Sequence, residues 1–136
     1  MYELFEHTAD LGLRARAADL GTLFAEMAKG LTAAIVEDAG SVRQDTEVRV
    51  ELAGGDREYL LFDWLRELLL RFETDRMLFA AFDVAVRDDG LSATARGEPF
   101  DPARHALSHE VKAITYHELK VGRDADGWLA EAIVDI

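Results

Sequence analysis

Two segments of the chain repeat their apolar residues at the spacing of an α-helix, which limits the folds that the chain can adopt. The first segment follows Asp19, whose carboxylate can accept free N–H groups of a first helical turn, and it stops before residues 38–40. The second runs from about Asp56 to Phe72. We therefore predict two amphipathic helices. Their apolar stripes are Leu20, Leu23, Phe24, Met27, Leu31 and Ile35, and then Leu61, Trp64, Leu65, Leu68, Leu69 and Phe72.

The rest of the chain has the two-residue alternation of half-buried β-strands. The clearest case is 46–52, and Asp89-Gly90 marks a tight hairpin between two further runs. The longest irregular stretch is 98–108. This order predicts a single α+β domain over residues 1–136, mostly one or more antiparallel sheets with the two helices packed on the sheet, where they can cover one of its faces. The other predicted strands are 2–6, 11–17, 82–86, 91–96, 114–121 and 128–136.

Composition and missing motifs exclude several classes of function. The 136 residues include no cysteine, which rules out disulfides, thiolate zinc sites and cysteine nucleophiles. There is no glycine-rich phosphate loop, nucleophile-elbow serine or His-Glu-x-x-His motif. No apolar run approaches the ~20 residues of a membrane helix, and the N-terminus lacks a signal pattern, so we expect a cytoplasmic protein.

The net charge of -12 bears on the kind of partner that the protein binds. Nucleic-acid binders usually carry a basic face, because neutralising phosphates supplies much of their affinity. An acidic chain in an RNA pathway is therefore expected to contact a protein rather than RNA. Solubility alone explains the charge equally well.

Two further patterns have alternatives that need no metal. His105 and His109 are four residues apart and could share one face of a helix, but a short histidine-containing loop is favoured. The run 124–127, Asp-Ala-Asp-Gly, resembles the start of a calcium loop without its later ligands. A hairpin tip explains this run better.

Polar residues that could form a site lie near both ends of the chain. His7-Thr8-Ala9-Asp10 interrupts the alternation between two predicted strands, and its residues alone favour a turn over a site. Asp135 and the carboxylate of Ile136 place two acids one residue apart. Anchored carboxylates so close repel each other unless a cation or proton lies between them. Lys112, one of three lysines, fits a solvated strand edge.

Taken in order along the chain, five segments resemble those of the archease family. No single segment is decisive, but together they span nearly the whole sequence. The segments are the opening motif His7-Thr8-Ala9-Asp10 with residues 11–15, the central residues 60–69 with Phe72-Glu73, Gly97-Glu98-Pro99-Phe100-Asp101, Glu110-Val111-Lys112-Ala113-Ile114-Thr115-Tyr116-His117, and the final Asp135-Ile136.

The resemblance implies a non-catalytic accessory protein for an RtcB-type RNA ligase in tRNA splicing and RNA repair. Archeases promote guanylylation of the ligase, allow repeated turnover and can widen its nucleotide choice. The resemblance also implies a divalent-metal site, for Ca²⁺, Mg²⁺ or Mn²⁺, with Asp10, Asp135 and the terminal carboxylate of Ile136 as ligands. It implies partner contacts at His7 and Lys112, with RNA reached only through the ligase and no membrane association.

Two other functions remain open at this point. One is a metal-dependent phosphoester hydrolase, in which an ion held by Asp10, Asp135 and His7 activates water. The other is a chaperone or modulator of RNA-modifying enzymes. Turnover of phosphoesters by the isolated protein would distinguish the first, and binding to such an enzyme without effect on a ligase would distinguish the second.

Overall fold

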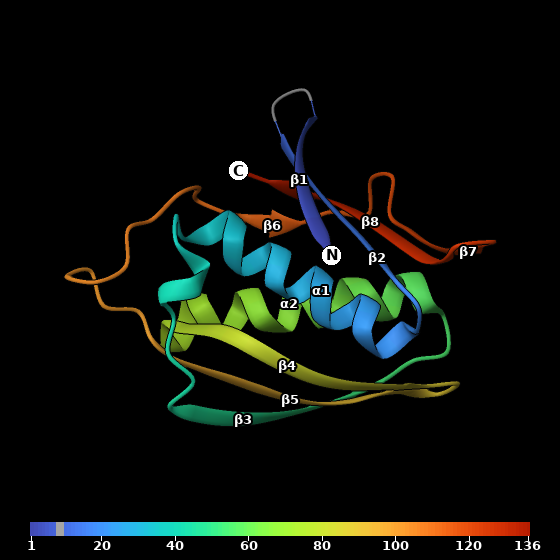
Figure 1. Cartoon of the computed structure of the whole chain (residues 1–136), viewed down its shortest axis with the longest axis horizontal. Coiled ribbons are helices and arrows are strands. Elements are labelled where there is room, and N and C mark those ends of the chain that lie inside the picture. The colour runs from blue at the N-terminus through green and yellow to red at the C-terminus, as the bar shows by residue number, and fades with distance from the viewer. Residues whose placement is uncertain (8–9) are drawn as a thin grey trace.

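A computed structural model describes residues 1–7 and 10–136, in which two helices lie between two antiparallel sheets (Figure 1). The helices are α1 (Leu20–Ile35) and α2 (Arg57–Asp75). One sheet has the order β1 (Tyr2–His7), β2 (Asp10–Ala17), β8 (Gly127–Asp135), β6 (Ala113–Ile114), and β7 (Lys120–Asp124) also pairs with β8. The other has the order β3 (Thr46–Ala53), β5 (Gly90–Pro99), β4 (Met77–Arg87).

Both predicted helices are confirmed, and each begins at an aspartate cap. The Asp19 carboxylate accepts the Thr22 N–H, 2.8 Å away, and the Asp56 carboxylate accepts two N–H groups of the first turn of α2. The predicted end of α2 at Phe72 is wrong, because the helix continues to Asp75. The apolar stripe stops where burial stops, whereas backbone hydrogen bonds continue one more turn to a left-handed cap at Arg76.

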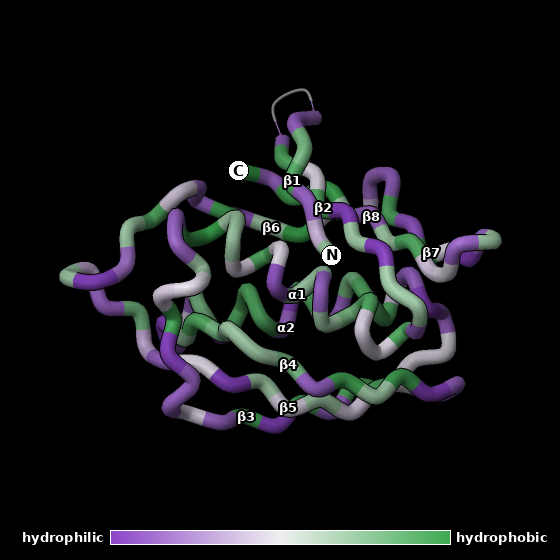
Figure 2. The backbone as a smooth tube through the Cα atoms, in the orientation of Figure 1, coloured by the Kyte–Doolittle hydropathy of each residue, from purple (hydrophilic) through white to green (hydrophobic). Residues whose placement is uncertain are grey.

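The predicted α+β fold, with antiparallel sheet and both helices packed on it, is confirmed, but the sequence did not show that a second sheet covers the other side of the helices. They are enclosed on two sides, so the core lies on both faces of the helix layer (Figure 1). Hydrophilic and hydrophobic residues alternate along β3 (Figure 2), and the more buried positions are the hydrophobic ones, so its hydrophilic residues lie on the outer face of the three-stranded sheet. The spacing of apolar residues reveals a stripe but not how many layers bury it, and α1 carries small residues that let a second sheet approach. Its buried small residues are Ala25, Ala28, Gly30 and Ala34.

The predicted strands are confirmed with three changes of bounds. Strand β4 begins at Met77, five residues before the predicted start at residue 82. Strand β5 extends through Glu98 and ends at Pro99, inside the stretch predicted to be irregular. The predicted strand 114–121 is divided into β6 and β7, which pair with different parts of β8. The backbone N–H and hydroxyl of Thr115 both donate to the Ile133 carbonyl, after which the chain leaves the ladder until Lys120.

The segment between Pro99 and β6 is held against the end of α1. The N–H groups of Ser108 and His109 donate to the carbonyls of Ile35 and Ala34, which the helix itself leaves free. This contact carries the chain from the three-stranded sheet back to the five-stranded one. No helix among the described residues has the length and apolar character needed to cross a membrane.

Candidate functional site

Asp10 and Asp135 meet at one end of the five-stranded sheet. Asp10 begins β2 and Asp135 ends β8, and the two strands run antiparallel. The ladder pairs Leu11 with Val134, and one residue further along each strand lie Asp10 and Asp135. Residues 125 positions apart in the sequence thus become neighbours because strands far apart in the chain pair at the centre of the sheet.

Alternation along the strands places the two carboxylates on the outer face. Leu11 and Val134 are buried and face the helices, so Asp10 and Asp135 face the other way and are half-buried. Facing positions in an antiparallel ladder have Cβ atoms about 4.5–5.5 Å apart, close enough for both carboxylates to bind one ion. None of the ion pairs within residues 1–7 and 10–136 includes either aspartate.

Two other predicted residues lie at the same end of the sheet, which we call the carboxylate corner after Asp10 and Asp135. The Lys112 N–H donates to the Asp135 carbonyl at 2.8 Å, just before Ala113 pairs with Asp135. Its side chain is exposed and lines a cavity of about 650 Å³ with residues 107–111. Ile136 is half-buried against the core, and the C-terminus lies near the β1–β2 hairpin (Figure 1). The structure therefore brings Asp10, Asp135, Ile136 and the Lys112 backbone together.

His7 lies beside Asp10, at the end of the β1–β2 hairpin. It is the last residue of β1 and pairs with Asp10, the first residue of β2. Its Nε2 lies 2.9 Å from a carboxylate oxygen of Glu118. Thr8 and Ala9, which belong to the predicted motif, lie outside the described residues.

Gly12 explains how the outer face beside Asp10 is built. The Phe5 ring lies across Gly12, and a Cβ atom at residue 12 would lie 2.2 Å from that ring. The Arg14 guanidinium also lies over the Phe5 ring, 4.3 Å from its centroid. This guanidinium pairs with Glu3 and Glu131, and these hydrogen bonds raise the pKa of Arg14. Because residue 12 is a glycine, the Phe5 ring of β1 can lie across the outer face of β2, near Asp10.

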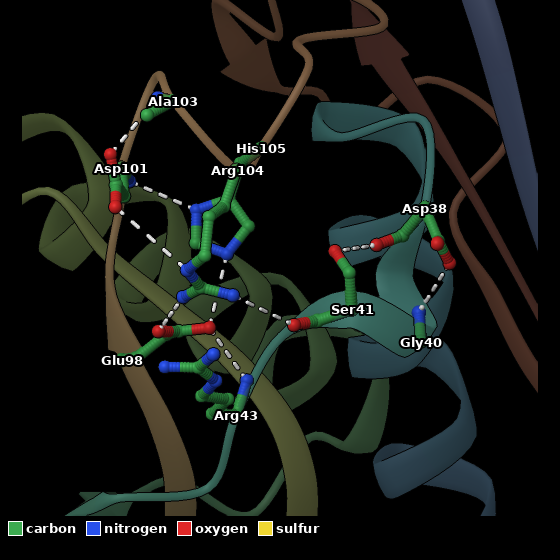
Figure 3. A network of polar contacts seen from close by, with 9 residues as sticks. All are labelled: Asp38, Gly40, Ser41, Arg43, Glu98, Asp101, Ala103, Arg104 and His105. Atoms are coloured by element: carbon green, nitrogen blue, oxygen red, sulfur yellow. Dashed lines mark hydrogen bonds and ion pairs between the residues drawn. The ribbon is translucent and has the colours of Figure 1, made fainter.

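His105 and His109 lie in a loop, as expected, and do not form a pair on a helix. The Nδ1 atom of His105 accepts the Asp101 N–H, so the proton lies on Nε2, which donates to Glu98 (Figure 3). The buried Glu98 carboxylate also accepts from the Arg104 side chain and the Arg43 N–H. The hydrogen bond from Arg104, followed by those from Arg43 and His105, lowers the pKa of Glu98 from 4.5 to about 2, although desolvation opposes the shift.

The run 124–127 forms the tip of the β7–β8 hairpin, as the sequence suggested. The Asp124 carboxylate accepts the Asp126 N–H, 2.9 Å away, and pairs with Arg16. Both hydrogen bonds, the backbone one first, lower the pKa of Asp124. Gly127 adopts φ 122°, a conformation that favours glycine.

Comparison with known proteins identifies the family. The sequence profile of the archease protein family matches residues 2–136. The chain belongs to the archease family. The archease of Methanopyrus kandleri is 43% identical, and the alignment covers 99% of each protein. The archease of Pyrococcus furiosus is 39% identical, over 99% of this chain and 98% of the relative.

Solved archease-like structures confirm the α+β fold. The solution structure of Methanobacterium thermoautotrophicum Protein 1598 superposes with a TM-score of 0.86 at 36% identity, covering 99% of this chain and 98% of the other. A Thermotoga maritima protein, described as an archease and possible chaperone, superposes with a TM-score of 0.60 at 23% identity, covering 100% and 98%. The latter supports the fold alone.

The archease resemblance seen in the sequence is thus confirmed, whereas the roles of individual residues remain predictions.

The sequence did not single out Glu118, the partner of His7. Glu118 follows His117 in the chain, but no spacing relates either residue to the N-terminal hairpin. Their proximity depends on the break between β6 and β7, which the alternation of apolar residues across 114–121 conceals.

Proposed function

We propose that this archease is a non-catalytic activator of an RtcB-type RNA ligase in tRNA splicing and RNA repair. In this role it promotes guanylylation of the ligase, supports repeated turnover and widens its nucleotide choice. The observation that carries the proposal is the placement of Asp10 beside Asp135 in a chain that belongs to the archease family.

A divalent cation, Ca²⁺, Mg²⁺ or Mn²⁺, is the cofactor that we propose for this corner. Asp10, Asp135 and the terminal carboxylate of Ile136 would supply the hard oxygen ligands that these ions prefer. The donor set fits, because half-buried carboxylates at adjacent ladder positions repel each other and a cation removes that repulsion. When bound, the ion would offset two of the three negative charges that these carboxylates bring together.

The charge of the protein supports docking on a ligase rather than on RNA. A net charge of -12 disfavours direct binding to phosphates and favours a basic surface on a protein partner. The exposed Lys112 and the partly exposed His7 flank the carboxylate corner and are the contacts that we propose for the ligase. RNA is then reached only through the ligase.

A ligation assay with the cognate ligase tests this function. Guanylylation and multiple-turnover ligation are measured without the archease, with the wild type, and with Asp10→Ala. The matched control is Asp88→Ala, which removes an exposed carboxylate from the turn between β4 and β5, on the other sheet. The wild type and Asp88→Ala should stimulate the ligase, and Asp10→Ala should not, although its circular dichroism spectrum should match that of the wild type.

Each result separates one part of the proposal from another. Failure of the wild-type protein to stimulate the ligase would reject the activator function. Full stimulation by Asp10→Ala would keep that function but remove the carboxylate corner from it. Phosphoester hydrolysis by the isolated protein, lost in Asp10→Ala, would favour the hydrolase alternative instead.

A further inference from the structure

A second group of metal-binding side chains lies beside the hairpin, and its chemistry differs from that of the carboxylate corner. His7 comes from the end of β1, and His117 and Glu118 come from the loop between β6 and β7. One ligand atom from each lies within 4.8 Å of the other two. In the described part of the chain, this is the one group of three histidine or acidic residues that meets this condition.

The distances fit a tetrahedral ion after a small movement of one side chain. Ligands about 2.0–2.2 Å from a tetrahedral metal lie roughly 3.3 Å from one another. The 2.9 Å separation of His7 Nε2 from Glu118 is already close to this value. His117 Nε2 lies 4.0 Å from the other Glu118 oxygen, and its side chain is 64% exposed and can rotate.

The loop that carries two of these residues is held in place. The Tyr116 ring stacks on Phe62 of α2 with a centroid distance of 3.9 Å, and the His117 N–H donates to the Thr115 hydroxyl at 3.3 Å. Glu118 then adopts the left-handed conformation, with φ 53°. The loop projects toward the top of Figure 1, as do the adjoining ends of β1 and β2, and the contact between the His7 and Glu118 side chains joins these two segments.

His7 and His105 differ in burial and in how fully their ring nitrogens are hydrogen-bonded. Both nitrogens of His105 have partners and its ring is fully buried. His7 is 25% exposed, and its buried Nδ1 has no hydrogen-bond partner among the described residues. Its ring is therefore not part of a closed network in that region, while a second imidazole lies 5.3 Å from it, centroid to centroid.

We propose that His7, His117 and Glu118 bind a divalent ion that prefers imidazole, such as Zn²⁺, at a site distinct from Asp10 and Asp135. Two imidazoles and one carboxylate suit Zn²⁺ and Co²⁺, whereas carboxylates alone suit Ca²⁺ or Mn²⁺. The bound ion ties the hairpin to the β6–β7 loop and leaves a fourth position for water. This site does not depend on the proposed ligase function.

Metal titration of the isolated protein, prepared without a polyhistidine tag and stripped with a chelator, tests the site. Calorimetry follows Zn²⁺, and visible absorption follows Co²⁺, whose d–d bands report imidazole ligands. His117→Ala and Glu118→Gln should each weaken Zn²⁺ binding about tenfold or more, since even outer partners of metal ligands contribute 10–100-fold. Both should also remove the Co²⁺ bands, and neither should change Ca²⁺ binding.

Matched controls make the same chemical changes elsewhere. His109→Ala removes another imidazole that is not fully buried, and Glu47→Gln changes a carboxylate that is 58% exposed and paired, much like Glu118 at 56%. Asp135→Asn should weaken Ca²⁺ binding alone. The proposal is overturned if the wild type shows no saturable Zn²⁺ site, if both loop variants bind Zn²⁺ normally, or if Asp135→Asn is the one variant that loses Zn²⁺.

Discussion

The indole N–H of Trp64 in α2 donates a hydrogen bond to the backbone carbonyl of Phe24 in α1, 3.0 Å away. The Trp64 side chain is fully buried and also meets the Phe82 ring edge to face, at 5.9 Å between centroids. One residue therefore joins both helices to the three-stranded sheet. Trp64, which the sequence places on the apolar stripe of the second predicted helix, therefore lies in the core.

Trp64→Ala should reduce the free energy of unfolding by about 3–5 kcal/mol, because it leaves a large cavity between the layers. Trp64→Phe keeps most of the volume and should cost less, about 1–3 kcal/mol for the lost hydrogen bond. Trp128→Ala is the control, since the Trp128 ring is half-buried under Arg57 and Arg123. Urea titration measures all three, and a stable Trp64→Ala protein that fails to activate the ligase would make Trp64 a contact residue.

A second prediction concerns acid stability. The folded protein holds the pKa of Glu98 near 2, below its ordinary 4.5, so the ionised carboxylate stabilises the fold at any pH above about 4.5. That contribution should disappear as the pH falls from about 4.5 to 2. Glu98→Gln should be less stable than the wild type at pH 7, and the difference should shrink across this interval. Urea midpoints between pH 7 and pH 2 test it, with Glu47→Gln as the exposed control, and a constant difference would contradict it.

The helices and most strands could be predicted because local patterns determine them. Asp19 and Asp56 mark helix starts by a hydrogen bond that needs only neighbouring residues, and the alternation in 46–52 needs only one buried face. The number of layers could not be predicted, because a stripe on α1 does not show whether one sheet or two cover it. The break after Ile114 was hidden for a similar reason, since the residues that follow Thr115 stop pairing with β8 until Lys120, and local alternation does not show this.

The candidate site likewise depends on contacts between distant segments, which local sequence patterns do not reveal. Asp10 and Asp135 were selected by resemblance, and nothing in their spacing places them together. They meet because β2 and β8, from opposite ends of the chain, pair in the middle of the sheet. Glu118 could not be identified from the sequence. It reaches His7 because it lies in a loop, whereas the alternation of apolar residues predicts a continuous strand there.

The last prediction concerns the third proposed ligand of the carboxylate corner. Adding Gly-Ser after Ile136 turns its carboxylate into a neutral amide, so Ca²⁺ or Mn²⁺ would lose one anionic ligand. We expect binding to weaken about tenfold or more, as for other changes around metal sites, and activation of the ligase to be lost. Metal binding should also no longer raise the thermal unfolding midpoint as far, because stabilisation follows affinity.

Ile136→Ala is the matched control, because it removes the side chain that packs against the core but keeps the terminal carboxylate. It should lower stability somewhat and leave metal affinity close to that of the wild type. If the two variants lose metal binding equally, anchoring of the last strand rather than the carboxylate explains the effect. If the extended protein binds Ca²⁺ and Mn²⁺ normally and still activates the ligase, the terminal carboxylate is not a ligand, and Asp10 and Asp135 must bind the ion with water in its place.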